Sequence, residues 1–242
     1  DSAITVSMQL PGINDIAAGV FFLARCESGD STARAWETYL RRPLFPTHFE
    51  RTPESATYTF LLPQGDDAGY AWLRTRDAGS EIDLLGPFGN GFTIDSAKPN
   101  LLLAADYVRA PLLSPLVDAA LDRGGRVTLL VRTQDTEIES ANDWLACLPF
   151  AVEARAETPA HFSDTLAYFL PWADQLCVAF APIEYAALAR IVRSNRMRPL
   201  PRFSQALVIT DLPCGIGACL ACVVPLARGG HTRACKHGPV FD

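Results

Sequence analysis

Short stretches of alternating apolar and polar residues occupy the first part of the chain. Residues 3–10 alternate in this way and predict a half-buried strand. Residues 20–24 (Val-Phe-Phe-Leu-Ala), 58–62 (Tyr-Thr-Phe-Leu-Leu) and 81–85 (Glu-Ile-Asp-Leu-Leu) predict further short strands. Many short strands separated by turn sequences predict a small β-barrel, here over residues 1–96.

The pattern changes at residue 97. Continuous apolar runs, typical of strands buried on both faces, cover residues 101–105, 126–131 and 175–180. Segments with a helical hydrophobic period follow these runs, at residues 111–122, 142–148 and 183–194. Alternating strands and helices predict a parallel α/β domain, nucleotide-binding-like in pattern, over residues 97–202. A short cysteine-rich domain, residues 203–242, completes the predicted three-part organisation.

Composition and charge narrow the function classes. Hydrophobic residues make up 49% of the chain and charged residues 20%, which is usual for a globular protein. The net charge of −6 argues against a general nucleic-acid binder. No apolar run approaches the roughly 20 residues that span a bilayer, and no charged-then-apolar leader opens the chain. We therefore expect a cytoplasmic protein without a membrane span.

The seven cysteines fall into two groups. Cys26, Cys147 and Cys177 are isolated within apolar segments, so we expect them to be small buried hydrophobic residues. The other four crowd the last 29 residues of the chain.

These four cysteines carry the strongest chemical signal. Cys214, Cys219, Cys222 and Cys235 have the spacing C-x4-C-x2-C-x12-C, and C-x4-C-x2-C with a distant fourth cysteine is the plant-type pattern for a 2Fe–2S cluster. Three thiolates of one loop must converge on the cluster, and the intervening residues are small, which lets backbone N–H groups approach the sulfurs. The sequence therefore predicts a 2Fe–2S cluster, which passes one electron at a time, and favours an electron carrier over a hydrolase.

Two alternatives stay open for the same four cysteines. A structural zinc site usually pairs its cysteines closely, and only Cys219 and Cys222 form such a pair. Disulfides require an oxidising compartment, which nothing in the sequence indicates. His231 and His237 flank Cys235, but four cysteines suffice as ligands, so we expect both histidines to be exposed loop residues.

At this point the chain resembles a known family. Residues 214–224 (Cys-Gly-Ile-Gly-Ala-Cys-Leu-Ala-Cys-Val-Val) and 235–241 (Cys-Lys-His-Gly-Pro-Val-Phe) resemble the tail of the electron-transfer subunit of class 1B dihydroorotate dehydrogenase. Residues 86–92 (Gly-Pro-Phe-Gly-Asn-Gly-Phe) are similar to that family's Gly-Pro-Leu-Gly-Asn-Gly-Phe. The resemblance implies a ferredoxin-reductase-like fold, with FAD at the barrel and a 2Fe–2S cluster in the tail.

The resemblance also implies a partner. Members of the family accept hydride from NADH and pass electrons to the FMN of a separate catalytic subunit, with which they form a heterotetramer. The implied partner is thus an FMN-containing catalytic dehydrogenase subunit in a hetero-oligomer, or another redox protein.

Three segments match the family's flavin-binding motifs. The family's Arg-Pro-x-Ser, Leu-x-Arg and Gly-Thr correspond here to residues 42–45, 61–63 and 69–70. The candidate flavin-binding residues are Arg42, Pro43, Leu44, Phe45, Leu61, Leu62, Pro63, Gly69 and Tyr70. Phe45, Pro63 and Tyr70 replace the family's serine, arginine and threonine, which leaves open a barrel with an empty or altered flavin site.

The nicotinamide motif departs further from the family. The family's Gly-Gly-Gly-Ile-Gly-x-Ala-Pro is replaced at residues 104–111 by Ala-Ala-Asp-Tyr-Val-Arg-Ala-Pro. Glycines let the backbone approach a dinucleotide, and Asp106 would add a like-charge contact of about 1–4 kcal/mol to a pyrophosphate. The family's Cys-Gly-Pro is also changed, to Phe-Ala-Pro at residues 180–182.

These departures weigh against NADH use. The leading hypothesis is an electron-transfer subunit with flavin and cluster, and its first rival is a redox sensor or assembly homologue that has lost nicotinamide binding, with or without flavin. A structural zinc protein and a full NADH oxidoreductase with an unusual loop stay open as further alternatives.

Overall fold

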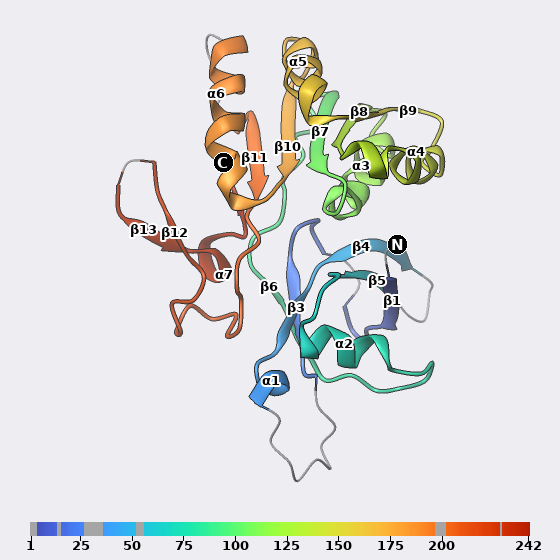
Figure 1. Cartoon of the computed structure of the whole chain (residues 1–242), viewed down its shortest axis with the longest axis vertical. Coiled ribbons are helices and arrows are strands. Elements are labelled where there is room, and N and C mark those ends of the chain that lie inside the picture. The colour runs from blue at the N-terminus through green and yellow to red at the C-terminus, as the bar shows by residue number, and fades with distance from the viewer. Residues whose placement is uncertain (1–3, 14–15, 27–35, 52–55, 197–201, 228) are drawn as a thin grey trace. The chain divides into compact units, whose positions relative to one another are not determined.

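The computed structural model describes residues 4–13, 16–26, 36–51, 56–196, 202–227 and 229–242. The chain forms two compact units (Figure 1). Unit 1 comprises Asp1–Gly91 and Thr210–Pro239, and unit 2 comprises Phe92–Ile209 and Val240–Asp242. The cysteine-rich segment thus belongs to the same unit as the barrel strands, and the domain boundaries at residues 96 and 202 stay a prediction.

Two three-stranded antiparallel sheets build the barrel of unit 1, in the orders β1-β5-β4 and β3-β2-β6. Their strands are β1 (Ile4–Gln9), β2 (Phe21–Ala24), β3 (Arg42–Leu44), β4 (Pro46–Arg51), β5 (Ala56–Leu62) and β6 (Leu84–Phe88). Two short helices accompany them, α1 (Trp36–Tyr39) and α2 (Ala68–Arg74). The strand predicted at residues 81–85 begins three residues later than expected, because only Leu84 onward pairs with β2.

One core joins the two barrel sheets. Phe22 and Leu44 come from one sheet, and Tyr58, Phe60 and Leu62 come from the other. Every second residue of β5 is buried, as the alternating pattern of that stretch predicts for a strand with one solvent-facing side. Packing of both sheets on these side chains confirms the predicted barrel.

The cysteine-rich segment adds a small hairpin and a helix to unit 1. Its elements are β12 (Val223–Pro225), β13 (His231–Arg233) and α7 (Ala234–His237). The loop before β12 carries Cys214 and Cys219, and Cys235 lies in α7.

Unit 2 is built on a six-stranded sheet with the order β14-β11-β10-β7-β8-β9. All neighbours are parallel except β14, which pairs antiparallel with β11. The strands are β7 (Asn100–Asp106), β8 (Arg126–Arg132), β9 (Val152–Glu157), β10 (Gln175–Ala179), β11 (Ser204–Leu207) and β14 (Val240–Phe241). The three continuous apolar runs are the central strands β7, β8 and β10, as predicted for strands covered on both faces.

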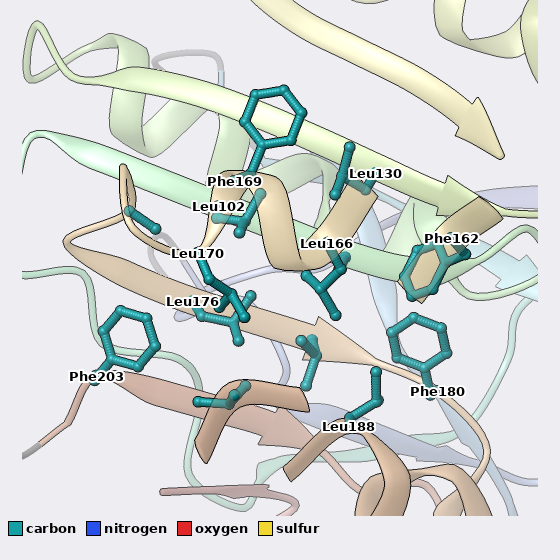
Figure 2. Packing of buried hydrophobic residues seen from close by; sticks show 14 residues of the cluster. Leu102, Leu130, Phe162, Leu166, Phe169, Leu170, Leu176, Phe180, Leu188 and Phe203 are labelled. Carbon is teal, nitrogen blue, oxygen red and sulfur yellow. The ribbon is translucent and has the colours of Figure 1, made fainter. Parts of the chain in front are cut away.

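Four helices cover this sheet. They are α3 (Ser114–Leu121), α4 (Ile138–Ala146), α5 (Pro159–Phe169) and α6 (Tyr185–Asn195), with 3-10 turns at Ala110–Leu113, Asp135–Glu137 and Pro182–Glu184. Helices α5 and α6 pack on one face, where Phe162, Leu166 and Leu188 meet Leu102 and Leu130 of the sheet (Figure 2). In the described part of the chain, no helix is long and apolar enough to cross a membrane.

The lone cysteines divide differently from the prediction. Cys26 and Cys177 are buried, as expected. Cys147 is exposed, so the expectation was wrong for this residue. It caps the C-terminus of α4, where its neighbour Leu145 faces the core and Cys147 itself faces solvent.

Candidate iron–sulfur cluster site

The four predicted ligands lie as two pairs of sulfur atoms. Cys214 Sγ and Cys219 Sγ are 3.3 Å apart, and Cys222 Sγ and Cys235 Sγ are 3.2 Å apart. Two thiolates bound at about 2.3 Å to one tetrahedral metal lie roughly 3.7 Å apart, so each pair is close to the spacing for one shared metal. A 2Fe–2S cluster with four cysteine ligands has two thiolates on each iron, and the donor set fits this group.

A single-metal site fits less well. Among the residues that the structure describes, no group of three or more His, Cys, Asp or Glu side chains is arranged to hold one metal ion. His231 and His237 are both exposed, as expected, although they lie in β13 and α7 and not in loops. His237 Nδ1 is 2.9 Å from Thr232 Oγ1, so the histidine of α7 interacts with a hydroxyl of the neighbouring strand β13.

The two pairs have different surroundings. Cys219 is exposed and Cys214 half-buried, whereas Cys222 and Cys235 are buried. Burial opposes ionisation of Cys214, but backbone hydrogen bonds from Cys219, Ile216 and Ala218 outweigh it and lower the pKa of this thiol to about 6. Burial, together with the neighbouring Cys222, raises the pKa of Cys235 to about 12. Metal binding must therefore displace a proton from the inner pair, while the loop already favours thiolate at Cys214.

The cysteine loop lies directly against the barrel. Gly215 has a φ of +68°, and a Cβ there would lie 3.0 Å from Leu23 Cδ1 and 3.1 Å from Phe88 Cδ2. The first residue after Cys214 is thus a glycine because of both its backbone conformation and its close contact with β2 and β6.

The stretch similar to the family's Gly-Asn-Gly holds the segment that follows Cys235. The backbone N–H of Asn90 donates to Gly238 O at 2.6 Å, and Asn90 Nδ2 donates to His237 O at 3.2 Å. A Cβ on Gly89, whose φ is +80°, would lie 2.4 Å from Pro239 Cδ. Sequence reasoning missed this role, because no spacing rule links Asn90 to a residue 147 positions away.

Four of the candidate flavin residues come together beside α2. Tyr70 Oη donates to Pro43 O at 2.9 Å. A Cβ on Gly69 would lie 2.7 Å from Arg42 Cγ, so the helix start is packed directly on the arginine. The structure thus places Arg42, Pro43, Gly69 and Tyr70 next to one another, and their role in flavin binding stays a prediction.

The guanidinium of Arg42 has an internal partner that the sequence did not reveal. Arg42 Nε lies 2.8 Å and 3.0 Å from the two carboxylate oxygens of Asp67. Asp67 also caps α2 by accepting from the Tyr70 N–H at 3.0 Å. Burial works against the charged form of Asp67, but the hydrogen bonds from Arg42 and Tyr70 outweigh it and lower the pKa of the carboxyl group. The Arg42 guanidinium is therefore paired with a carboxylate within the barrel.

The other flavin candidates belong to the packing of the barrel. Leu44 and Leu62 lie in the core, and Leu61 is half-buried. Phe45 is buried, with its ring centroid 5.7 Å from that of Phe21. Pro63 is exposed, and its carbonyl accepts a hydrogen bond from Arg74. None of these five side chains carries a polar group.

Ion pairs occupy the carboxyl ends of the parallel strands in unit 2, where dinucleotides bind in folds of this kind. Arg109 Nη1 lies 2.6 Å from Asp106 Oδ2 at the end of β7. At the end of β8, Arg132 makes two hydrogen bonds of 3.1 Å to Glu184. The hydrogen bonds from Arg132 lower the pKa of Glu184 against the smaller effect of burial.

Comparison with known proteins agrees with the cysteine geometry. Residues 211–242 match the family of the iron–sulfur cluster binding domain of dihydroorotate dehydrogenase B. The protein from Geobacillus sp. strain WCH70 named dihydroorotate dehydrogenase B (NAD(+)), electron transfer subunit, is 26% identical over 215 residues, which are 84% of this chain and 78% of that protein. A protein of the same name from Geobacillus kaustophilus is 26% identical over 219 residues, 86% of this chain and 80% of its own length. The chain is a divergent relative of these dihydroorotate dehydrogenase B electron transfer subunits.

Solved structures agree with the fold of this divergent relative. A chain from the structure of NADH-dependent reduced ferredoxin–NADP oxidoreductase superposes with a TM-score of 0.74 at 18% identity, covering 100% of this chain and 83% of that one. The ferredoxin reductase of carbazole 1,9a-dioxygenase superposes with a TM-score of 0.59 at 15% identity, covering 83% of this chain and 62% of that one. The predicted ferredoxin-reductase-like fold is therefore confirmed.

Proposed function

We propose that this chain is an electron-transfer iron–sulfur flavoprotein that passes electrons between FAD and a partner protein through a 2Fe–2S cluster. The observation that carries the proposal is the two-by-two arrangement of Cys214, Cys219, Cys222 and Cys235 within the segment that matches an iron–sulfur binding domain. A 2Fe–2S cluster bound there would accept and release single electrons.

The outer sulfur pair faces the partner in this proposal. Cys219 is exposed, and apolar side chains lie exposed beside it along the chain, with Ile216 at 67% and Leu220 at 58%. Exposed apolar side chains around a redox centre are typical of a docking surface. The inner pair, Cys222 and Cys235, is buried and anchors the cluster in unit 1.

The flavin would lie on the same barrel sheet as the cysteine loop. Gly215 packs on Leu23 of β2, and Leu23 pairs directly with Pro43 of β3. Arg42, next in the chain, would hold a phosphate of FAD. FAD bound at this place would accept a pair of electrons and deliver them one at a time to the cluster.

The partner in this proposal is an FMN-containing catalytic dehydrogenase subunit with which the chain forms a hetero-oligomer in the cytoplasm. The names of the relatives support this assignment, because they are electron transfer subunits of dihydroorotate dehydrogenase B. Chemistry at a substrate would then belong to the partner.

A second candidate is a redox sensor or assembly homologue that keeps only the cluster. Two observations favour it over full activity. First, the ion pairs Asp106–Arg109 and Arg132–Glu184 lie at the strand ends where a nicotinamide dinucleotide would bind. Second, the Arg42 guanidinium, which would hold a flavin phosphate, is paired with Asp67.

Cofactor analysis of protein prepared without oxygen separates the two candidates. The flavoprotein releases FAD on acid extraction and shows a flavin absorption band beneath that of the cluster, whereas the sensor releases no flavin. Addition of excess NADH tests the donor, and we expect the absorption to remain unbleached. Protein that contains no iron and no sulfide would overturn both candidates.

A further inference from the structure

One arginine lies against the cysteine loop without an acidic partner. Arg233 Nη1 donates to Gly217 O at 3.0 Å, between Cys214 and Cys219 in the chain. The guanidinium is half-buried, and no carboxylate lies within ion-pair distance of it among the described residues. A half-buried charge ordinarily pairs with an opposite charge, so this cation points to an anion that belongs to the site.

Arg233 is fixed in place from three directions. It pairs with Val223, the residue after Cys222, in the β12–β13 hairpin. It directly precedes α7, which carries Cys235. Its side chain follows the Gly217 backbone, where a Cβ would lie 3.4 Å from Arg233 Cδ. The guanidinium is thus held beside the loop by backbone pairing and does not depend on its single hydrogen bond alone.

We propose that Arg233 raises the reduction potential of the cluster by placing a fixed positive charge beside its ligands. This inference rests on the proposed function, because it presumes a 2Fe–2S cluster at the four cysteines. One-electron reduction adds one negative charge to a centre already surrounded by thiolates, and net charge and hydrogen bonding are two of the factors that set cluster potentials. A guanidinium stays charged at every accessible pH, so its effect is constant. Arg233 is a positioning and tuning residue and not a ligand.

The chain offers a matched control in Lys236. Its Cδ lies 3.5 Å from the position of a Cβ on Gly217, so this cation belongs to the same loop neighbourhood. Unlike Arg233, it is exposed, and solvent screens its charge. The difference between the two cations isolates the effect of the half-buried one.

The test is an EPR-monitored redox titration of the anaerobic protein and of the variants R233Q, R233K and K236Q, reduced with dithionite. We expect R233Q to make reduction about tenfold less favourable, a fall of about 59 mV for a one-electron couple. K236Q should leave the potential within a small fraction of that change. R233K keeps the charge but loses the planar fork, so its fall should lie between the two.

Iron and acid-labile sulfide content are measured on every variant. An unchanged potential in R233Q with a full cluster would overturn the inference while the proposed function stands. If R233Q does not retain the cluster, R233M, which also removes the charge, is titrated in its place, and an unchanged potential there also overturns the inference. Loss of the cluster from both neutral variants would show that Arg233 serves to retain the cluster, and this too overturns the tuning role. Wild-type protein without iron would refute the proposed function itself.

Discussion

The cysteine segment of unit 1 and the carboxyl edge of the sheet in unit 2 differ in how well they match the motifs of the family that the chain resembles. In the first, four sulfur atoms lie in two pairs of 3.2–3.3 Å, and Gly215 of the intervening loop fits closely against the barrel. In the second, Asp106 and Arg109 stand in the segment that aligns with the family's glycine-rich motif, and their side chains pair with each other. The cysteine segment has all four sulfur ligands of the family's cluster motif. At the sheet edge, side chains that form ion pairs stand where the family has glycines.

The difference follows from what each ligand requires. A plant-type 2Fe–2S cluster takes four cysteine thiolates at a characteristic spacing, so its site can be recognised in the sequence. A dinucleotide site depends on glycines that let the backbone approach the pyrophosphate. Any side chain that the fold tolerates at these positions can block this approach. The cluster is therefore the cofactor that the sequence of this chain indicates most strongly, and the electron donor of the chain need not be NADH.

Loss of one inner ligand should have the largest effect. C222S removes a buried thiolate, and a serine hydroxyl at this position stays protonated and binds iron weakly. We expect complete loss of iron and sulfide from the purified protein. C147S is the control, since Cys147 is exposed and lies outside the site, and its cluster content should equal that of the wild type.

The contact between the barrel and the tail gives the next largest effect. G89A places a methyl group 2.4 Å from Pro239 Cδ in addition to its strained φ of +80°. We expect a loss of about 3 kcal/mol or more in unfolding free energy and faster release of iron. G79A tests the backbone strain alone, because Gly79 has a φ of +89° with open space around it, and it should cost only about 1 kcal/mol.

Equal thermal stability of G89A and G79A would show that the Gly89–Pro239 contact does not matter. The matched pair therefore separates contact from conformation.

Flavin affinity sharpens the comparison from the barrel side. D67N removes the negative charge beside Arg42 but keeps a side chain that caps α2. We expect FAD to bind about tenfold more tightly, since a phosphate no longer competes with a carboxylate. Quenching of flavin fluorescence measures the dissociation constant.

D83N is the matched control for D67N. Asp83 forms a 2.6 Å ion pair with Arg41, the residue before Arg42. D83N therefore removes a carboxylate from the same barrel but leaves the Arg42–Asp67 pair in place, and it should leave flavin affinity unchanged. Equal FAD affinities of D67N and the wild type would show that Asp67 does not compete with a flavin phosphate for Arg42.

The ion pair at the end of β8 should give the smallest effect. Arg132 lowers the pKa of Glu184, so the pair stabilises the fold above the ordinary glutamate pKa of 4.5 and loses this contribution as pH falls through the lower folded value. E184Q should therefore cost about 0.5–1 kcal/mol near pH 7, and this cost should shrink as the pH falls below the ordinary glutamate pKa. Urea unfolding at several pH values measures this, and a pH-independent cost would contradict the assignment.

Regular parts of the fold were accessible from the sequence. The apolar runs of β7, β8 and β10 are strands covered on both faces, and the cysteine spacing identifies a group that the structure brings together. Strand β9 and helix α5 were not predicted. The strand reads Val-Glu-Ala-Arg-Ala-Glu at the edge of the sheet, where every second residue is charged and the apolar positions are small.

Pairings between distant residues were beyond sequence reasoning. The partner of Arg42 is Asp67, 25 residues away, and neither the family motif nor any spacing rule names it. The Asn90 contact with His237, in the segment after Cys235, joins residues 147 positions apart. Such contacts depend on how the barrel closes, which local patterns do not specify.

The central claim is that four thiolates hold two bridged irons. Iron, acid-labile sulfide and the EPR spectrum of dithionite-reduced protein, prepared without oxygen, test it directly. The account predicts two irons and two sulfides per chain and one unpaired spin after reduction. Colourless protein with one zinc per chain and no sulfide would contradict it.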